Sequence, residues 1–268
     1  MPPSHATPDR LARLATGASA EVYAWDAGRV VKLFRRDFPR EAIEVELHHA
    51  RIAHGLGLPT PSVAGLIELD GRTGIVFERC DGPTLYELIQ SRARDLGELA
   101  SVFYDLQQAI HRCQAPGLQP LQARLVRRIA YARGVPESLK NEAIGLVQAA
   151  PVGNAVCHGD FHPINVLMTA GRPVVIDWLD AARGDPAIDV TRSLLYLKYA
   201  RPRQVDHDAR TAFLEAYVDR CRQAWAGRME QLERWQFPVA VARLSEAVED
   251  AERASLMKLI ERADSLWR

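Results

Sequence analysis

The sequence has no excess of charge of either sign. Its 268 residues include 34 Lys plus Arg and 34 Asp plus Glu, so the formal charges balance. A protein that binds nucleic acid or an anionic membrane through broad electrostatic attraction usually carries a clear basic excess. The composition therefore predicts no nucleic-acid partner and no membrane-surface partner.

Long apolar segments and paired cysteines are also absent. Residues 1–5 contain no apolar signal core, and no uninterrupted apolar run reaches membrane-spanning length. The four cysteines are widely separated and form no Cys-x-x-Cys pair. Scattered cysteines fit reduced thiols better than a disulfide framework or a zinc site, so we expect a cytoplasmic protein.

A glycine-rich phosphate loop of the form G-x-G-x-x-G is missing as well. The segment Thr16–Tyr23 contains a single glycine, Gly17, among small residues that include Ser19. It could form a turn whose backbone amides approach phosphates, but one glycine alone is weak evidence for such a loop.

The first eighty residues have a β-rich pattern. Apolar and β-branched residues alternate with polar ones in several short runs, and turn residues separate the runs. We expect strands at 20–25, 29–34, 63–69 and 74–78, with a helix at 40–55.

Beyond residue 83 the pattern is mainly helical. We expect helices at 84–92, 95–113, 121–133, 137–149, 186–200, 207–226, 230–244 and 246–266. The exception is the stretch 160–178, where short apolar runs flank a turn. The chain is therefore expected to be an α+β protein. Residues 1–80 would form a small β-rich N-terminal lobe, and residues 81–268 a larger, mainly helical C-terminal lobe.

The most informative segment is His158–Asn165 together with the residues up to Trp178. Asp160 precedes Asn165 by five residues, and Asp177 follows a predicted hairpin that begins after Asn165. Kinase-type phosphoryl transfer needs such a set, with one Asp to orient and deprotonate a hydroxyl and an Asn and an Asp to hold Mg²⁺. A hairpin would bring Asn165 and Asp177 together at its open end, where both offer oxygen ligands to the metal.

A lysine on an early strand, Lys32, occupies the position where kinases keep the lysine that holds the nucleotide phosphates. Such a lysine needs a glutamate from the next helix. On a helical wheel Glu46 lies closest to the apolar face of the helix at 40–55, and Glu44 lies further round. We therefore predict an ion pair between Lys32 and Glu46, with Glu44 as the reserve partner.

Two other functions compete with this interpretation. A Gly-Asp-x-His string also occurs in metal-dependent phosphoesterases, which hydrolyse their substrates, but these need further ligands of a dinuclear site. A nucleotide-binding regulator on a kinase-like scaffold is the second alternative. The joint presence of Lys32, Asp160, Asn165 and Asp177 argues against a regulator, because a binding module does not need the base.

Taken together, these motifs resemble the aminoglycoside phosphotransferase family of small-molecule kinases, which includes choline-kinase-like enzymes. The matching segments are 17–23, Lys32, the helix carrying Glu46, 74–79, 158–165, 174–178 and 185–189. The resemblance implies a bilobal protein-kinase-like fold that binds ATP (or GTP) and Mg²⁺. Asp160 would then be the catalytic base and Asn165 and Asp177 the metal ligands. Backbone groups from Glu78 to Cys80 would receive the purine, and Asp189 would support the catalytic loop.

The phosphate acceptor is expected to be a hydroxyl of a small molecule such as an aminoglycoside, an amino alcohol or a sugar. Glu246, Glu249 and Asp250 fall at i, i+3 and i+4 of the helix predicted at 246–266, so their carboxylates would share one face. The ordinary explanation is a solvated face paired with Arg243 and Arg253. The sharper hypothesis is that this face attracts a cationic acceptor.

Overall fold

The computed structural model describes residues 11–200 and 206–261, which form two compact units. Unit 1 comprises the described part of Met1–Pro83 together with Val166–Asp180, and unit 2 comprises Thr84–Asn165 and the described part of Ala181–Arg268. The hairpin after Asn165 thus belongs to unit 1, whereas the division predicted from the sequence assigned it to the C-terminal lobe.

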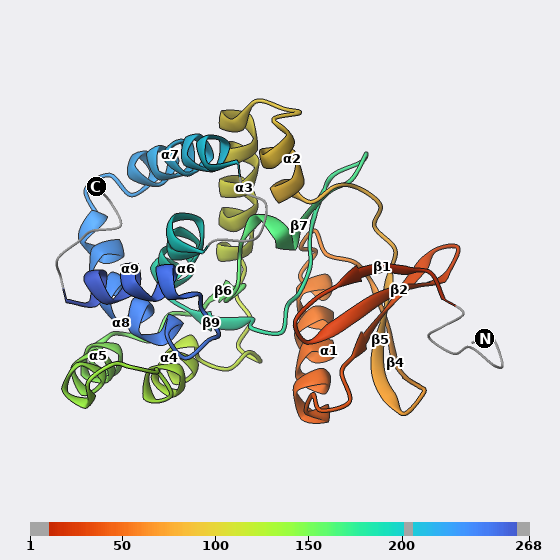
Figure 1. The fold of residues 1–268 in the computed structure, drawn as a ribbon, viewed down its shortest axis with the longest axis horizontal. Coiled ribbons are helices and arrows are strands. Elements are labelled where there is room, and N and C mark those ends of the chain that lie inside the picture. Colours follow the sequence, from red (N-terminus) through yellow and green to blue (C-terminus); the bar gives the residue numbers. More distant parts are fainter. Residues whose placement is uncertain (1–10, 201–205, 262–268) are drawn as a thin grey trace. The chain divides into compact units, whose positions relative to one another are not determined.

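Unit 1 is built on a five-stranded antiparallel sheet with the strand order β1-β2-β3-β5-β4 (Figure 1). The elements are β1 (Arg13–Thr16), β2 (Ala20–Asp26), β3 (Arg29–Phe34), α1 (Arg40–Gly55), β4 (Val63–Leu69) and β5 (Arg72–Glu78). The four predicted strands and the helix are confirmed. The edge strand β1 was not predicted, because its four residues are exposed and show no alternation of apolar side chains.

The two faces of this sheet bury different side chains. On β3, Val31 and Leu33 join a cluster on one face, while Phe34 packs on the other face with Ile43 of α1. Successive residues of a strand point to opposite faces, so Lys32 shares the face of Phe34. The strand thereby directs Lys32 towards α1.

A short hairpin of β7 (Val166–Met168) and β8 (Pro173–Val175) completes unit 1. The Met168 N–H donates to the Pro83 carbonyl at 2.8 Å. The neighbouring Gly82 approaches so closely that a Cβ there would lie 2.4 Å from the Met168 carbonyl oxygen. Only glycine fits at this contact, which joins the hairpin to the end of the segment that follows β5.

Unit 2 is mainly helical. Its helices are α2 (Leu85–Ser91), α3 (Leu96–His111), α4 (Leu121–Ala130), α5 (Glu137–Ala149), α6 (Pro186–Tyr199), α7 (His207–Ala224), α8 (Met229–Arg243) and α9 (Asp250–Ile260). Strands β6 (Ala155–Cys157) and β9 (Ala182–Gly184) pair antiparallel. The predicted helices lie within a few residues of these bounds except for the last, which starts at Asp250. Within the described residues, no helix combines the length and apolar character that crossing a membrane requires.

An aromatic cluster joins the long helices of unit 2 to the loop that carries Asp160. The Phe161 ring stacks on Phe103 of α3 with a centroid distance of 4.4 Å. Phe213 and Tyr217 of α7 meet Phe103 edge-on at 5.8 and 5.2 Å. Aromatic packing thus fixes the residue directly after Asp160.

Candidate active site

In unit 1, Lys32 is bonded to two carboxylates. Its Nζ lies 2.6 Å from Glu46 Oε1 and 3.1 Å from Asp177 Oδ1. The predicted Lys32–Glu46 ion pair is therefore confirmed, and Glu44 instead pairs with Arg40 on the surface. Burial would lower the pKa of Lys32, but the two carboxylates raise it above its usual value, so the ammonium stays charged.

Glu46 is one of the most deeply buried carboxyl groups in unit 1, with 1% of its surface exposed. Burial raises the pKa of Glu46 to about 7, although Lys32 opposes this shift. The negative charges of Asp177 and Asp180 raise it further. A single ammonium thus faces several carboxylates, and this site carries a surplus of negative charge.

Asp177 stands in a strained turn. Its φ angle is 66°, a left-handed conformation that few non-glycine residues adopt. The turn is held by the next residue, because Trp178 is buried and its Nε1 donates to the Val175 carbonyl at 3.1 Å. The Trp178 and Leu179 carbonyls both lie 3.2 Å from Nδ1 of His49, which therefore carries the proton and donates. Strain of this kind persists where packing over-determines the geometry, as at functional sites.

The turn that contains Gly17 and Ser19 is held from its carbonyl side by Arg35. The guanidinium donates to the Ala18 carbonyl at 2.7 Å and to the Gly17 carbonyl at 3.2 Å. The Arg35 N–H donates to the Ser19 carbonyl at 2.9 Å, and the Gly17 N–H donates to Ala20 at 2.8 Å. Gly17 therefore has no free amide for a phosphate, whereas the three carbonyls are fixed in one direction.

The backbone around Glu78 is partly committed to the sheet. The Glu78 N–H donates to Ser62 and the Arg79 N–H donates to Gly28, each at 2.9 Å. The Glu78 carboxylate accepts from the Ser62 N–H and hydroxyl at 3.1 and 3.0 Å. Any purine contact through an N–H group of this segment is thus left to Cys80, and the contact itself stays a prediction.

In unit 2, the loop carrying Asp160 is held from beneath by Asp189 of α6. Asp189 is buried and accepts hydrogen bonds from the backbone N–H groups of His158 at 3.2 Å and Gly159 at 2.8 Å. His111 Nε2 lies 2.9 Å from the same carboxylate. Gly159 has a φ of 79°, which a glycine adopts without strain. The expected supporting contact of Asp189 is thus present.

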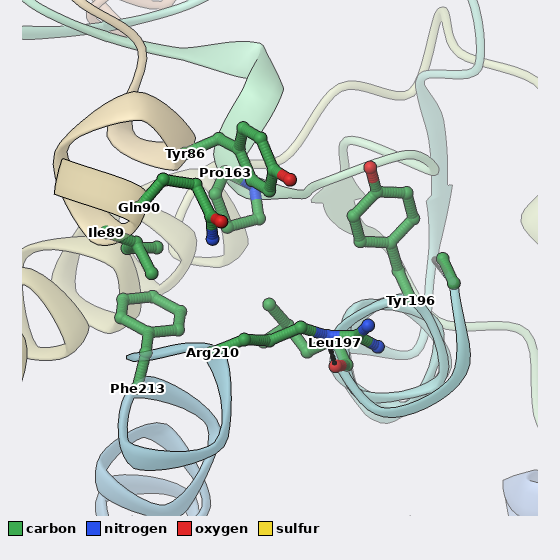
Figure 2. Close-up of a pocket in the computed structure, with 9 residues that line it drawn as sticks. Tyr86, Ile89, Gln90, Pro163, Tyr196, Leu197, Arg210 and Phe213 are labelled. Carbon is green, nitrogen blue, oxygen red and sulfur yellow. Dashed lines mark hydrogen bonds between the residues drawn. The ribbon is translucent and has the colours of Figure 1, made fainter. Parts of the chain in front are cut away.

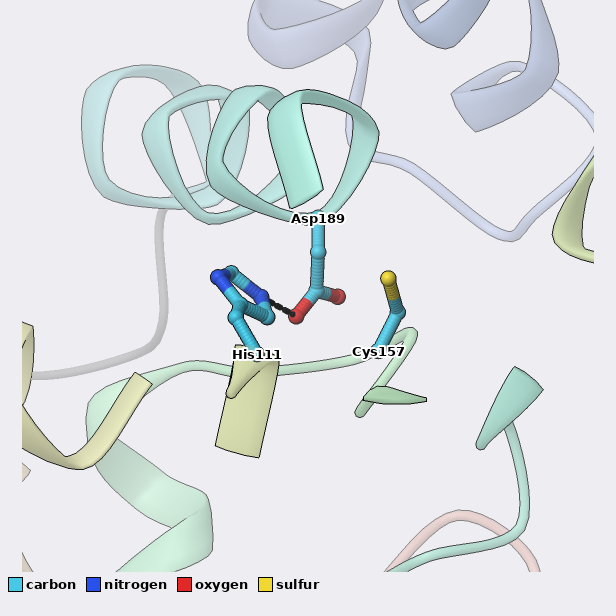
Figure 3. A group of neighbouring side chains, drawn as sticks. All are labelled: His111, Cys157 and Asp189. Atoms are coloured by element: carbon cyan, nitrogen blue, oxygen red, sulfur yellow. Dashed lines mark hydrogen bonds and ion pairs between the residues drawn. The ribbon is translucent and has the colours of Figure 1, made fainter. Parts of the chain in front are cut away.

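His111, Cys157 and Asp189 lie close enough together to suggest a metal site (Figure 3). Their atoms have other partners, however. Both Asp189 oxygens accept N–H groups of the loop, and Cys157 Sγ donates to two backbone carbonyls at 3.8 Å. Burial raises the pKa of the Cys157 thiol well above its usual value, which disfavours the thiolate that a metal would bind. The hydrogen bonds of this cluster support the loop, and we assign it no metal.

Asp160 is paired with a cation that was not predicted. Its Oδ1 accepts from Arg192 of α6 at 2.8 Å, and its Oδ2 lies 3.4 Å from His162 Nε2. Burial alone would raise the pKa of Asp160, but Arg192 and His162 hold it well below its usual range. Asp160 is therefore ionised and able to accept a hydrogen bond from a hydroxyl.

Asn165 is oriented by the same loop. It ends the short 3₁₀ turn Pro163–Asn165, is buried, and its Nδ2 donates to the Asp160 carbonyl at 3.0 Å. The amide oxygen, Oδ1, is then the atom that suits a hard metal ion. The joint binding of one ion by Asn165 and Asp177 stays a prediction, since the two residues belong to different units.

The prediction that Glu246, Glu249 and Asp250 share a helix face is wrong. Glu246 lies in a bend after α8, three residues before the N-cap of α9, so the helical spacing does not apply. Glu249 is that N-cap and Asp250 is the first helical residue, and both are exposed. The run 245–249 contains no Gly or Pro, so the sequence carried no signal for this break.

Glu246 is surrounded by arginines. Its carboxylate lies 2.9 Å from Arg128 and 2.8 Å from Arg192, and it also pairs with Arg243. Burial would raise the pKa of Glu246, but the three guanidinium groups lower it to about 2. Arg243 also binds the buried Glu252 at 2.8 Å. Glu246 thus holds Arg192 against Asp160. Its negative charge is offset by three arginines and does not attract a cationic acceptor.

Three functional candidates were missed by sequence reasoning, namely Arg35, His49 and Arg192. His49 follows Glu46 by three residues on α1, so both point in one direction, and this spacing was a usable signal. Arg192 stands between Thr191 and Ser193, which are fully buried. A charged residue in a buried helix needs an ionic partner, but nothing in the sequence indicates which one.

Comparison with known proteins places this geometry in a family. Residues 10–231 match the model of the phosphotransferase enzyme family. The chain belongs to the phosphotransferase enzyme family. Among curated proteins, no sequence matches this chain. This membership confirms the resemblance that the motifs indicated, and it confirms that the protein is a small-molecule kinase.

Several solved structures share the fold of this chain. A thermostable mutant of aminoglycoside phosphotransferase APH(4)-Ia aligns with a TM-score of 0.66 at 19% identity, covering 96% of this chain and 94% of that one. Amicoumacin kinase hAmiN, in complex with AMP-PNP, Ca²⁺ and Ami, gives 0.63 at 16% identity, covering 98% and 91%. A choline/ethanolamine kinase family protein from Mesorhizobium loti gives 0.57 at 19% identity, covering 98% and 89%. At these identities the comparison establishes the fold and leaves the acceptor open.

Proposed function

We propose that this enzyme transfers the terminal phosphoryl group of ATP (or GTP) to a hydroxyl group of a small molecule in a Mg²⁺-dependent reaction. The acceptor oxygen forms a bond to the γ-phosphorus while the bond from that phosphorus to the β,γ-bridging oxygen breaks. The hydroxyl proton passes to Asp160, and the products are a phosphate ester and ADP (or GDP). The four free cysteines fit a reducing compartment, in agreement with a cytoplasmic location.

The observation that carries this proposal is the double contact of Lys32. A lysine held by a buried glutamate and by a carboxylate on a strained turn is suited to binding nucleotide phosphates, because its charge is fixed before the ligand arrives. The same arrangement explains why Glu46 must be buried on α1. A solvated glutamate would hold the ammonium only weakly.

The residues present fit a magnesium ion. Asp177 offers a carboxylate with 41% of its side chain exposed, and Asn165 offers an amide oxygen, both hard oxygen ligands. Of the three charged groups that act most strongly on Glu46, only Lys32 is a cation. A divalent cation would balance the negative charge here and would neutralise charge on the phosphates.

Asp160 is suited to orient the acceptor hydroxyl more than to remove its proton early. Because its pKa is held low, it is a weak base that stays ionised over the working pH range. In the loose transition state of phosphoryl transfer, the nucleophile keeps its proton until late, so orientation is the main requirement. Arg192 fixes the carboxylate through Oδ1 and leaves Oδ2 beside His162.

The similarity to amicoumacin kinase bound to AMP-PNP and Ca²⁺ supports the use of a nucleotide and a divalent ion. Solved structures that share the fold have names that indicate aminoglycosides, choline and ethanolamine, so the fold does not choose among acceptors. The carboxylates Glu246, Glu249 and Asp250 do not form one face and do not assign a cationic acceptor.

The test is a screen of wild-type enzyme with Mg·ATP over aminoglycosides, amino alcohols, sugars and neutral alcohols, with mass detection of the phosphorylated product. A product that appears with wild type and is lost with Asp160→Asn supports the proposal. Phosphate release without any acceptor would favour the hydrolase alternative. Nucleotide binding with neither product nor phosphate release would favour the regulator.

A further inference from the structure

One helix, α6, contacts every residue of the catalytic loop from 158 to 162. Asp189 accepts the first two backbone N–H groups of this loop, and Arg192 donates to Asp160 Oδ1. Ser193 is fully buried, and its Oγ donates to the Phe161 carbonyl at 2.7 Å. The α6 side chains that hold the loop recur at i, i+3, i+4 and i+7, so they share one face of the helix: Asp189, Arg192, Ser193 and Tyr196.

Tyr196, the last residue on this face, holds His162. Its ring stacks on the imidazole with a centroid distance of 4.1 Å and an interplanar angle of 10°. Tyr196 projects from α6 into a small apolar pocket that Pro163 of the same loop also lines (Figure 2). Burial and the charge of Asp160 raise the pKa of Tyr196 to about 12, so its hydroxyl keeps its proton beside the carboxylate.

The buried imidazole of His162 lies between the base and a predicted metal ligand. Its Nε2 is 3.4 Å from Asp160 Oδ2 and 3.3 Å from Asn165 Nδ2. Nε2 donates to Asp160 if it carries a hydrogen, and it accepts from Asn165 if it does not.

Two observations decide between these arrangements of His162. Asp160 is ionised, and a carboxylate attracts an N–H donor strongly. Nδ1 of the imidazole is buried and has no hydrogen-bond partner in the part of the chain that the structure describes, so a hydrogen placed there would leave a buried donor unsatisfied. The geometry thus places the hydrogen on Nε2, which faces Asp160 Oδ2.

We infer that His162 and Tyr196 are positioning residues for phosphoryl transfer: His162 donates from Nε2 to Asp160 Oδ2, and Tyr196 keeps the imidazole in that orientation by stacking. The inference rests on the proposed function for the role of Asp160. The terminal torsion of an aspartate is soft, so a carboxylate held through one oxygen can still swing. Arg192 fixes Oδ1 and His162 fixes Oδ2, which leaves a further lone pair of Oδ2 for the acceptor hydroxyl.

Tyrosine variants separate the stacked ring from its hydroxyl. With the acceptor identified by the screen, Tyr196→Leu should lower kcat about tenfold and leave the KM for ATP unchanged, because lost orientation at the reacting centre slows the reaction without weakening nucleotide binding. Tyr196→Phe keeps the ring and should restore kcat. Tyr131→Leu makes the same change at a tyrosine of unit 2 that is 73% exposed, and it should behave as wild type. A normal kcat in Tyr196→Leu, or a kcat in Tyr196→Phe that is as low as in Tyr196→Leu, overturns the inference.

Variants of His162 test the donated hydrogen. His162→Leu removes the donor and should lower kcat at least about tenfold. Glutamine carries an N–H group at nearly the same reach from the backbone as Nε2, so His162→Gln should recover much of that loss. This comparison holds even if Tyr196→Leu does not fold. Equal kcat values for His162→Leu and His162→Gln overturn the assignment of the donor.

NMR of the full chain without nucleotide or metal measures the contact directly and needs no acceptor. The ring nitrogen signals of His162, assigned through His162→Gln, should show the hydrogen on Nε2. The carboxyl-carbon signal of Asp160, assigned through Asp160→Asn, should move in Tyr196→Leu and stay in place in Tyr131→Leu. A hydrogen on Nδ1 alone, or an Asp160 signal that does not respond to Tyr196→Leu, overturns the inference.

The two readouts together separate this inference from the proposed function. If the NMR signals behave as stated but Mg·ATP phosphorylates no acceptor, the contact that orients Asp160 stands and the proposed function fails. If wild type forms a phosphorylated product and both His162→Leu and Tyr196→Leu form it at the same rate, the proposed function stands and the inference is overturned.

Discussion

Unit 1 and unit 2 each contain an ionic site, and the pKa values of the carboxylates in the two sites shift in opposite directions. In unit 1, a single ammonium faces several carboxylates, and the pKa of Glu46 rises to about 7. In unit 2, three guanidinium groups surround Glu246, whose pKa falls to about 2, and Asp160 is also held ionised. Glu46 is 1% exposed, whereas 24% of the Glu246 side chain is exposed, so deeper burial and a lower ratio of cations to carboxylates both favour the higher pKa of Glu46.

The difference matches the two tasks of a phosphotransferase. A site with surplus negative charge is ready for a divalent cation and its bound phosphates. A charge-balanced site holds the acceptor-facing carboxylate in one geometry without attracting a metal of its own. Under the proposed function, the surplus site would serve metal binding together with Asn165, and the balanced site would serve orientation of the hydroxyl.

The largest expected effect comes from the balanced site. Asp160→Asn should lower turnover by roughly 10²–10⁴-fold, the usual contribution of general acid–base catalysis, because the amide cannot accept the proton. Nucleotide affinity should change little. Steady-state kinetics with the identified acceptor measures both values, and Asp219→Asn on the exposed surface of α7 is the matched control. Near-normal turnover in Asp160→Asn contradicts the assignment of the base.

The surplus site should respond mainly through the metal. Asp177→Ala should raise the Mg²⁺ concentration needed for half-maximal nucleotide binding by roughly 10–100-fold. Asn165→Ala should have a smaller effect, since it removes a neutral ligand. Calorimetric titration of ATP at several Mg²⁺ concentrations checks the order. If both variants keep the wild-type metal dependence, neither residue holds the ion.

The ionic site of unit 1 could be predicted from the sequence, but that of unit 2 could not. The kinase-like position of Lys32 on its strand indicated a glutamate partner on the next helix, and the helical wheel favoured Glu46 over Glu44. The local partner of Glu246, Arg243, was named from the sequence, but the other two partners, Arg128 and Arg192, lie 118 and 54 residues away, and local periodicity carries no information on such contacts. The continuous helical character around residues 245–249 also concealed the bend that turns Glu246 inward.

Removal of Arg192 should leave the site around Asp160 and Glu246 with a surplus of negative charge. Arg192→Gln should lower the free energy of unfolding by about 1–2 kcal/mol at pH 7, a value reduced for the partial exposure of Asp160. A carboxyl group whose pKa is lower in the folded state than in the unfolded state stabilises the fold at pH values above its unfolded-state pKa. This stabilisation is lost as the pH falls through the folded-state pKa. For Glu246 the window runs from 4.5 down to about 2.

The stability difference between wild type and Arg192→Gln should therefore shrink when the pH is lowered from 7 to 3. Urea unfolding at both pH values measures it. Arg222→Gln, which removes an exposed arginine paired with Asp219, serves as the control and should show a smaller difference at either pH. If the stability difference between wild type and Arg192→Gln does not depend on pH, then Arg192 does not lower the pKa values of Asp160 and Glu246.

The smallest effect is expected at the Gly17–Ser19 turn. Arg35→Ala should raise the KM for ATP about threefold to tenfold, because the turn loses the guanidinium that fixes the Gly17 and Ala18 carbonyls, while kcat changes less. The neighbouring Arg36 pairs with Asp70 on the surface, and Arg36→Ala should leave the KM unchanged. Equal kinetics for the two variants would mean that Arg35 does not organise a nucleotide site.

The most direct measurement is a carboxyl-carbon NMR titration of the free enzyme, with Glu46 and Asp160 assigned through Glu46→Gln and Asp160→Asn. The account predicts that Glu46 titrates near pH 7 and that Asp160 stays ionised well below its usual value of 3.8. Addition of Mg²⁺ alone should lower the pKa of Glu46, because the divalent ion offsets the negative charge beside it. Titration of both groups at their ordinary values, or of Asp160 above Glu46, would contradict the account.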